Sequence, residues 1–289
     1  MRPILISTDS TADLPEQYLI DNNVDLHPLH YIIDDVEYGK ELDIEEPSLH
    51  EFYDMVRAGK MPTTNATSLD NDIKMFKAAA EAGYDVIHIP FSAKMSTSCN
   101  NCILAAQEVM DECPDANIFV FDTKSGSGGQ AIMVRKAVDM KNAGKSFDEI
   151  KEFLLDSVSK TKVFVTVPDL TTLCRGGRVS KSSAFVGNVL KIQPTLIIDA
   201  EGGLEVTNKM RGRKAAMNFL VDTLKPLKEA NKLPDEVAIG HGDCIEDAEV
   251  LANMVKEAYG IEKIHIAYLC QTLGSHTGPN VLTLSFIEK

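Results

Sequence analysis

The sequence predicts an α/β protein of two lobes, and three observations lead to that prediction. Through the first 160 residues, short apolar runs alternate with helical patterns, as in a parallel βαβ sheet. Later, two β-rich runs meet at Ala200-Glu201-Gly202-Gly203, which is typical of an antiparallel hairpin. A chain of 289 residues is long enough for two such units. We expect an N-terminal α/β domain over 1–160 with a mainly parallel sheet flanked by helices, and a C-terminal α+β domain with a mixed sheet over 161–289.

The elements of the first half follow from apolar periodicity. Strands are predicted for short apolar runs at 3–7, 24–32, 86–90, 117–122 and 163–167. Amphipathic helices are predicted between them, near 13–21, 47–58, 69–82, 97–111, 127–143 and 147–158. The last helix has the clearest start, because Ser146 and Glu149 stand at capping-box spacing.

The second half mixes the two kinds of pattern without regular alternation. We expect a helix near 180–190, followed by hairpin strands at 194–199 and 204–207. Further helices are expected near 212–230 and 244–258, and further strands near 236–240, 264–269 and 281–287. Gly260 is a plausible stop signal for the helix that ends near residue 258.

Charge and hydropathy exclude several function classes. The chain has 29 basic and 43 acidic residues, and the formal net charge of −14 opposes nucleic-acid binding, which requires Lys and Arg against phosphates. No apolar run approaches the roughly 20 residues of a membrane span, so stable membrane insertion is not expected. The first residues lead directly into a strand without the apolar region of a signal peptide, which indicates a cytoplasmic protein.

The cysteines do not indicate a metal site. Cys99 and Cys102 form a C-x-x-C, but no second Cys or His pair stands at metal-ligand spacing. Both fall at helical spacing, where small buried thiols are the simpler interpretation. We therefore predict no metal and no cofactor.

A polar segment follows the first predicted strand. It runs from Ser7 to Leu14 and carries hydroxyl and carboxylate side chains, among them Asp9, Ser10 and Asp13. In a parallel sheet, ligands bind at the carboxyl ends of the strands. This segment is therefore a candidate floor for a ligand pocket, with solvated capping residues as the alternative.

Two further segments are rich in hydroxyl groups and precede predicted helices. One contains Thr64 and Asn65, and the other contains Ser96 and Thr97. A helix N-terminus attracts carboxylate or phosphate through its free N–H groups and the positive end of its dipole. Two such helix entrances could converge on one anion, with Ser96 or a neighbouring hydroxyl as the N-cap.

Two glycine-bounded motifs add candidate ligand groups. Arg175-Gly176-Gly177-Arg178 pairs backbone freedom with guanidinium groups that suit carboxylate or phosphate, although a helix C-cap with surface arginines gives the same pattern. Gly274-Ser275-His276-Thr277-Gly278-Pro279 is expected to place His276 in a tight loop. A hydrolase or transferase that uses Ser10 or Ser96 with His276 stays open, although the chain lacks a G-x-S-x-G nucleophile elbow.

Four motifs in this order and spacing resemble the DegV family of bacterial fatty-acid-binding proteins, whose characterised members are the FakB carriers. The resemblance runs nearly end to end. The motifs are Thr8-Asp9-Ser10-Thr11-Ala12-Asp13-Leu14, Gly176-Gly177-Arg178-Val179-Ser180, Arg211-Gly212-Arg213-Lys214-Ala215 and His276-Thr277-Gly278-Pro279. The resemblance implies a long-chain fatty acid in a tunnel between two lobes. It also implies a carrier, not an enzyme, that presents the acid to a separate kinase subunit for acyl-phosphate formation in phospholipid synthesis.

The resemblance also assigns ligand-binding positions. It implies that Thr64 and Ser96 hold the carboxylate, with His276 and Arg178 beside it. Asn65 and Thr97 stand within the same segments, where the family usually has Ser and Gly, and Asn280 replaces a common Gly. Possible secondary positions, within the other motifs, are Ser10, Gly177 and Arg211.

Overall fold

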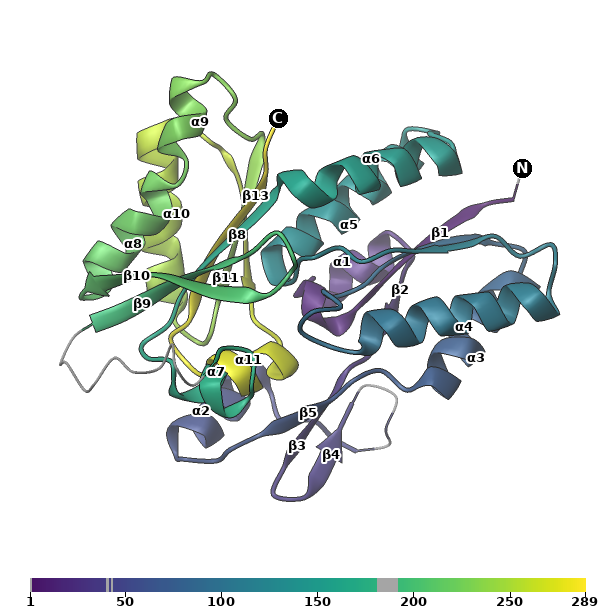
Figure 1. Ribbon diagram of the computed structural model, residues 1–289, viewed down its shortest axis with the longest axis horizontal. Helices are drawn as coiled ribbons and strands as arrows, with labels where there is room; N and C mark the ends of the chain where they lie inside the picture. Colours follow the sequence, from purple (N-terminus) through teal and green to yellow (C-terminus); the bar gives the residue numbers. More distant parts are fainter. Residues whose placement is uncertain (1, 40–41, 43, 181–191) are drawn as a thin grey trace.

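The N-terminal lobe is built on a parallel sheet, as predicted. The computed structural model describes residues 2–39, 42, 44–180 and 192–289. Within them, the N-terminal sheet has four parallel strands in the order β2-β1-β6-β7. Figure 1 shows β1 and β2 of this sheet in purple, close to the N-terminus. Its strands are β1 (Ile4–Asp9), β2 (Val24–His27), β6 (Asp85–Ile89) and β7 (Ile118–Val120).

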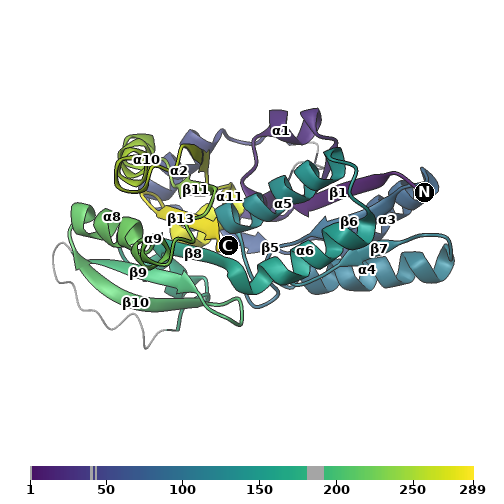
Figure 2. The ribbon, with the colours of Figure 1, turned by 90° about the horizontal axis from the view of Figure 1, so that it is seen from above.

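Helices cover both faces of this sheet because alternate strand residues point to opposite sides. Leu5 and Val86 pack under α3 (Leu69–Glu81) and α4 (Ser98–Glu112). Their neighbours Ile6 and Ile87 face the other way. That opposite face is covered by α1 (Glu16–Asp21), α5 (Ser127–Asn142) and α6 (Phe147–Lys160) (Figure 2).

The C-terminal lobe has the predicted mixed sheet. In the described residues it has six strands in the order β10-β9-β8-β13-β11-β12, and β11 and β12 form its parallel pair. The strands are β8 (Thr161–Thr166), β9 (Ile192–Ile198), β10 (Leu204–Arg211), β11 (Glu236–His241), β12 (Lys263–Tyr268) and β13 (Leu282–Ile287). One face packs against α8 (Arg213–Asp222), α9 (Lys225–Glu229) and α10 (Ile245–Tyr259).

Helix α5 joins the lobes. It packs against β1 of the parallel sheet and against β11 and β13 of the mixed sheet. Gly128 permits this approach, since a Cβ there would lie only 2.8 Å from the Ala238 Cβ. A helix held between two layers is buried on most of its circumference, as the first turns of α5 are.

A small antiparallel sheet corrects one predicted strand. The run 24–32 is two strands, β2 and β3 (His30–Ile33), separated at Pro28, which has no N–H to continue the ladder. Strand β3 leaves the parallel sheet and pairs with β4 (Val36–Tyr38) and β5 (Thr63–Asn65). Thr64 therefore lies in a strand, and α3 (Leu69–Glu81) begins a few residues later, after Ser68, as expected for this segment.

Other elements also differ from the predictions. The helix expected near 13–21 is shorter: a 3₁₀ turn occupies Ser10–Ala12 and α1 begins only after Pro15. The helix expected at 212–230 is two helices, α8 and α9, which are interrupted shortly before Pro226. Pro226 has no N–H to donate to the carbonyl oxygen four residues earlier, so α8 cannot continue through it. The helix expected near 180–190 lies outside the described residues.

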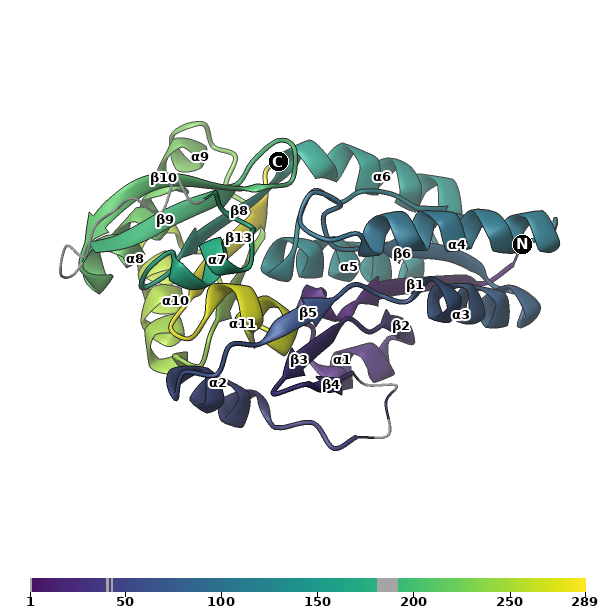
Figure 3. The same cartoon turned by 60° about the horizontal axis from the view of Figure 1, so that its bottom comes forward.

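Two short helices were not predicted. They are α7 (Thr171–Arg175) and α11 (Gln271–Thr277), which contact each other, and α11 also contacts α2 (Leu49–Arg57) and β5 (Figure 3). His276 therefore lies in the last turn of a helix and not in a loop. Gly274 allows α11 to approach α2, because a Cβ there would lie 2.7 Å from Phe52.

The division into 1–160 and 161–289 stays a prediction. Helix α6 ends at Lys160 and β8, in the mixed sheet, begins at Thr161. Yet Tyr53, on α2, donates a hydrogen bond to the Leu269 carbonyl oxygen at 3.0 Å. Part of the first segment is thus packed onto the second. Among the helices that the structure describes, none has the length and apolarity to cross a bilayer.

Candidate ligand-binding site

Two adjoining cavities lie at the junction of the lobes. The smaller, of about 360 Å³, is lined by all six residues predicted to surround the ligand head group: Thr64, Asn65, Ser96, Thr97, Arg178 and His276. The larger has about 700 Å³. Both are lined by Leu29 and Thr272, so these two residues mark where the cavities meet.

His276 is held from two sides. Its Nε2 lies 2.8 Å from the Thr64 hydroxyl oxygen. Its Nδ1 faces Gly176, where a Cβ would lie only 2.2 Å away. Burial lowers the pKa of His276 to about 4, with a further contribution from the positive charges of Arg178 and Arg175. The imidazole is therefore neutral at pH 7 and can act as either a donor or an acceptor toward a carboxyl oxygen.

Arg178 is fixed by backbone oxygens. Its Nε donates to the Met95 carbonyl at 3.1 Å and its Nη1 donates to the Gly176 carbonyl at 2.7 Å. Burial lowers its pKa, but a guanidinium stays charged in proteins. These bonds join the end of α7 to the segment before α4 and place a positive charge on the smaller cavity.

Ser96 precedes α4 but is not its N-cap. The helix begins at Ser98, and its neighbour Thr97 occupies the N-cap position, which the prediction allowed, but makes no side-chain cap hydrogen bond. The Ser96 hydroxyl accepts from the Ser98 backbone N–H at 3.2 Å and lies 2.9 Å from the Ser98 hydroxyl. Because α4 starts at the cavity wall, the positive end of its dipole favours an anion there.

Strand β5 presents Thr64 and Asn65. Thr64 pairs in register with Tyr31 of β3 and reaches across to α11 through His276. Asn65 lines the smaller cavity, but its amide nitrogen donates to Glu37 at 2.7 Å. The strand therefore directs the Thr64 hydroxyl to the ligand position and leaves Asn65 at the edge.

The larger cavity has a mainly apolar wall with a polar end. Its apolar lining includes Leu14, Leu19, Leu26, Leu49, Ile245 and Ile266. Asp9, Ser10 and Asp13 line it as well, which confirms that the segment after β1 forms part of a pocket. Burial raises the pKa of Asp13 to about 7, although hydrogen bonds from Ser127 and the Cys270 N–H oppose that rise.

The three secondary candidates are not brought to the smaller cavity. Ser10 lines the larger one, and its hydroxyl accepts from the Leu29 N–H at 3.0 Å. Gly177 is an exposed turn residue with φ +73°. Arg211 ends β10 with an exposed side chain and lines neither cavity.

Sequence reasoning missed several residues that shape the site. Gly176, rather than Gly177, is the glycine that makes room for His276. The Arg175-Gly176-Gly177-Arg178 motif indicates a close approach to the backbone, but it does not show which of the two glycines the His276 side chain contacts. Leu29 and Thr272 join the cavities and carried no signal, since a single Leu or Thr is ordinary in any sequence.

Comparison with known proteins places this arrangement in a family. The family model described as "Uncharacterised protein, DegV family" matches residues 3–289. A DegV domain-containing protein of Clostridium perfringens is 34% identical over 287 residues, covering 99% of this chain and 98% of that protein. The chain belongs to the DegV family.

Solved DegV structures share the fold. The crystal structure of a fatty acid binding DegV family protein from Streptococcus agalactiae has a TM-score of 0.86 and 28% identity, with both chains covered completely. A DegV family protein from Eubacterium eligens, loaded with heptadecanoic acid, has a TM-score of 0.84 and 25% identity, covering 99% of this chain and all of the other.

The departure from the DegV pattern at Asn280 has a structural reason. Asn280 has φ +61°, in the left-handed region that glycine adopts freely and that asparagine tolerates best among the other residues. Its carbonyl oxygen accepts a hydrogen bond from Arg213 Nη1 at 2.8 Å. This bond connects the motif that contains Arg213 to the residue directly after the His276-Thr277-Gly278-Pro279 motif.

In this DegV chain the imidazole of His276 is not paired with either candidate serine among the described residues. In the residues that the structure describes, the side-chain partner of His276 Nε2 is Thr64, and neither Ser10 nor Ser96 hydrogen-bonds to the imidazole. A serine nucleophile needs a base within hydrogen-bond reach. The low pKa of His276 also makes it a weak base.

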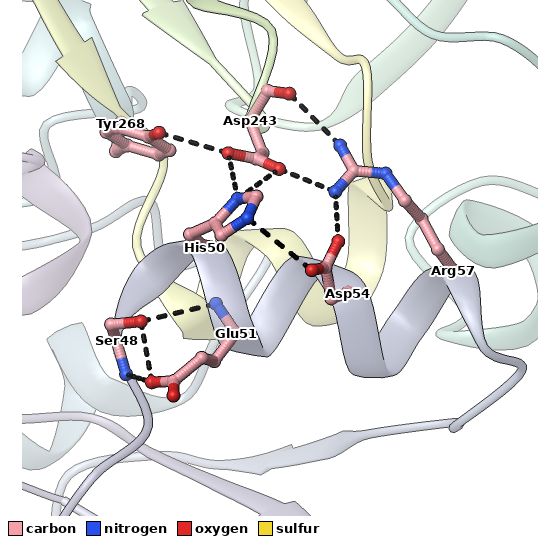
Figure 4. A network of polar contacts seen from close by, with 7 residues as sticks. All are labelled: Ser48, His50, Glu51, Asp54, Arg57, Asp243 and Tyr268. Atoms are coloured by element: carbon pink, nitrogen blue, oxygen red, sulfur yellow. Dashed lines mark hydrogen bonds and ion pairs between the residues drawn. The ribbon is translucent and has the colours of Figure 1, made fainter.

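A polar network holds α2 over the larger cavity (Figure 4). Asp243, after β11, accepts from Arg57 Nη1 at 2.5 Å, from His50 Nδ1 at 3.0 Å and from the Tyr268 hydroxyl at 3.0 Å. Leu49, on α2, and Tyr268, on β12, line the cavity. The network therefore fixes the position of two wall residues from opposite sides of the junction.

The pKa values of two histidines in this region, His276 and His50, should be shifted in opposite directions. We expect the His276 imidazole to stay neutral from pH 8 to pH 5, because burial lowers its pKa to about 4. His50 should titrate above 6.5, because its hydrogen bond to Asp243 raises its pKa. Long-range ¹⁵N NMR of the imidazole nitrogens measures both. A His276 midpoint near 6.5 would contradict the buried geometry.

The same shift has a consequence for stability. Between pH 6.5 and about 4, the unfolded chain protonates this histidine and the folded chain does not. The contribution of His276 to stability is therefore present above pH 6.5 and is lost as the pH falls toward 4.

Proposed function

We propose that this DegV chain binds one long-chain fatty acid and presents its carboxylate to a partner kinase. The observation that carries the proposal is the pair of adjoining cavities that share Leu29 and Thr272: the smaller gathers the convergent polar groups, and the larger is mainly apolar. The carboxylate would occupy the smaller cavity and the acyl chain the larger. Small-molecule sites commonly measure about 300–1,000 Å³ and combine apolar walls with a few convergent polar groups.

The head-group contacts would come from three elements. Thr64 on β5 and Ser96 before α4 supply hydroxyl donors, and Arg178 after α7 supplies positive charge. Hydrogen bonds to a charged group are worth about 1.5–3 kcal/mol each, more than neutral ones. Neutral His276 could donate to the same carboxylate and would not add charge.

The acyl chain would supply most of the binding energy. Each buried CH₂ contributes about 0.8 kcal/mol. A chain of about 16 carbons therefore gains roughly 10 kcal/mol before the cost of association and ordering. This is ample for tight binding, so no covalent step is needed to retain the ligand.

The relatives support this assignment. The Streptococcus agalactiae protein is described as fatty acid binding, and the Eubacterium eligens protein was loaded with heptadecanoic acid. Both share the fold over essentially the whole chain.

The kinase role is supported by the exposed edge of the smaller cavity. Lys94 and Thr97 line this cavity and have exposed side chains, so the head-group position lies near solvent. A carboxylate oxygen there could attack the γ-phosphorus of ATP held by another subunit, which forms an acyl phosphate and releases ADP. In this account the chain is a carrier, acts in the cytoplasm and contributes no nucleophile of its own.

A reconstitution assay tests the presenting role. The chain loaded with radiolabelled palmitate is mixed with ATP and a purified fatty acid kinase subunit, and acyl phosphate is trapped with hydroxylamine as the hydroxamate. We expect product only when both proteins are present. A kinase that phosphorylates palmitate on a known carrier but never on this chain would contradict the presenting role and leave binding untouched.

Arg178 should matter more for transfer than for binding. Arg178→Met removes the guanidinium that would offset charge on the transferring phosphoryl group, and charge stabilisation of this kind is worth about 2.7–4 kcal/mol. We expect acyl-phosphate formation to fall by about 10²–10³-fold. The loss in palmitate affinity should be smaller. Arg175→Met, at an exposed neighbour that does not line the cavity, is the matched control and should change neither.

A further inference from the structure

A buried cluster of nitrogen and sulfur donors lies beneath α3 and α4 and lines neither cavity. His27 ends β2, His88 lies in β6 and Cys102 lies in α4, and each side chain is 0% exposed. One ring nitrogen of each histidine and the Cys102 sulfur lie within 4.8 Å of one another. The two imidazole rings are 4.4 Å apart, centroid to centroid.

The two histidines are held in the same way. His27 Nδ1 donates to the Asp72 carboxylate at 2.7 Å, and His88 Nδ1 lies 2.9 Å from the Ser7 hydroxyl. The Nε2 atoms of both rings are buried and have no hydrogen-bond partner in the described part of the chain. Metal-binding histidines almost always use their second ring nitrogen in this manner, which fixes the tautomer and leaves a lone pair free on the other.

We propose that His27, His88 and Cys102 bind one thiophilic transition-metal ion, with Zn²⁺ as the first candidate. Two imidazoles and a thiolate suit Zn²⁺ and Cu⁺, whereas Mg²⁺ and Ca²⁺ prefer oxygen ligands. On binding, Cys102 loses its thiol proton to solvent and the sulfur forms a bond to the ion. The thiolate and the Asp72 carboxylate then balance the two positive charges of Zn²⁺.

The two Nε2 atoms make the cluster energetically unfavourable as it stands. A buried polar nitrogen without a partner costs about 1–3 kcal/mol, and there are two of them here. Burial raises the pKa of the Cys102 thiol, which stays neutral unless a cation deprotonates it. A bound ion gives both nitrogen atoms a partner.

The cluster is connected to the head-group segments through hydrogen bonds. Asp72 accepts from the Thr67 hydroxyl at 2.7 Å, and the Thr67 N–H donates to the Ser98 hydroxyl at 3.2 Å. The Ser98 hydroxyl lies 2.9 Å from that of Ser96. Ordering of His27 and Asp72 by an ion would therefore also order the segments that carry Thr67 and Ser96. The ion is structural, since the cluster is closed to solvent.

The test uses the full chain, refolded in metal-free buffer with one equivalent of Zn²⁺ or Co²⁺ and then desalted. We expect one ion per chain by elemental mass spectrometry and a thiolate-to-cobalt charge-transfer band. X-ray absorption of the wild-type protein should show sulfur together with nitrogen in the first coordination shell. A shell without sulfur would overturn the proposal, because it would place the ion elsewhere, for example at the exposed group His50, Asp54 and Asp243. Absence of bound metal would overturn it equally.

Matched variants locate the site within α4. Cys99→Ala removes a buried thiol one turn away and should keep both the ion and the charge-transfer band. Cys102→Ala should lose both. Equal metal content in the two variants would overturn the proposal. If Cys102→Ala does not refold, X-ray absorption of the wild-type protein tests the proposal by itself, through the presence or absence of sulfur in the first coordination shell. Asp72→Asn should weaken Zn²⁺ affinity by about 10–100-fold.

Discussion

Replacement of Thr64 by valine together with Ser96 by alanine should weaken fatty-acid binding by about 10²–10⁴-fold. Each hydroxyl is placed to donate to the ligand carboxylate, and a hydrogen bond to a charged group is worth about 1.5–3 kcal/mol. Loss of two such bonds removes about 3–6 kcal/mol, and every 1.4 kcal/mol is about tenfold in affinity. Displacement of a fluorescent fatty acid from delipidated protein measures the change.

The chain offers a matched control for this double variant. Thr63→Val with Ser68→Ala alters the same strand and the same kind of side chain at two exposed positions that do not line the smaller cavity. Ser68 makes no side-chain cap bond to α3, so its loss should not unfold the helix. The control should bind as the wild type does. Unchanged affinity in the Thr64 and Ser96 variant would show that the carboxylate lies elsewhere.

Shortening the acyl chain should have an effect of similar or greater size. Octanoate has eight CH₂ groups fewer than palmitate, and each is worth about 0.8 kcal/mol when buried. The difference is roughly 6 kcal/mol, so octanoate should bind up to about 10⁴-fold more weakly. The physical reason is the cavity of about 700 Å³ beyond Leu29 and Thr272, which only a long chain fills. Isothermal titration with a series of chain lengths checks this.

A variant that fills the larger cavity tests whether the acyl chain is buried there or binds to apolar surface elsewhere. Ala267 lies on β12 and lines the cavity wall. Ala267→Phe should reduce palmitate affinity and leave octanoate affinity nearly unchanged, because the short chain does not reach that wall. An equal loss for both acids would contradict the assigned path of the chain.

The central strands of the parallel sheet were predictable because they are buried on both faces. The strands β1 and β6 carry consecutive apolar residues, Ile4-Leu5-Ile6 and Val86-Ile87, as central parallel strands require. The same reasoning failed at 24–32, since the residues on both sides of Pro28 are equally strand-like. Only pairing shows that β2 and β3 belong to different sheets.

The short helix α11 was not predictable from local signals. Gly274 and His276 are poor helix formers, and the glycines around them suggested a loop. The helix is stabilised by its packing instead: Gly274 lies against Phe52 and Tyr53, which come from a distant part of the chain. Propensity is a weak signal where tertiary contact decides the conformation.

In the candidate site, too, some residues could be predicted from the sequence and others could not. The motifs gave Thr64, Ser96, Arg178 and His276, and the structure places all four on one cavity. They could not give the contact between His276 and Gly176, since that depends on how α7 meets α11. The donor cluster of His27, His88 and Cys102 was beyond sequence reasoning, because no spacing rule connects residues from two strands and a helix.

The measurement that tests the central claim most directly is mass spectrometry of an organic extract from natively purified protein, calibrated to the amount of chain. Our account predicts one long-chain fatty acid per chain, and its length identifies the preferred ligand. An empty extract, together with no binding when fatty acids are added back to the folded protein, would contradict the account.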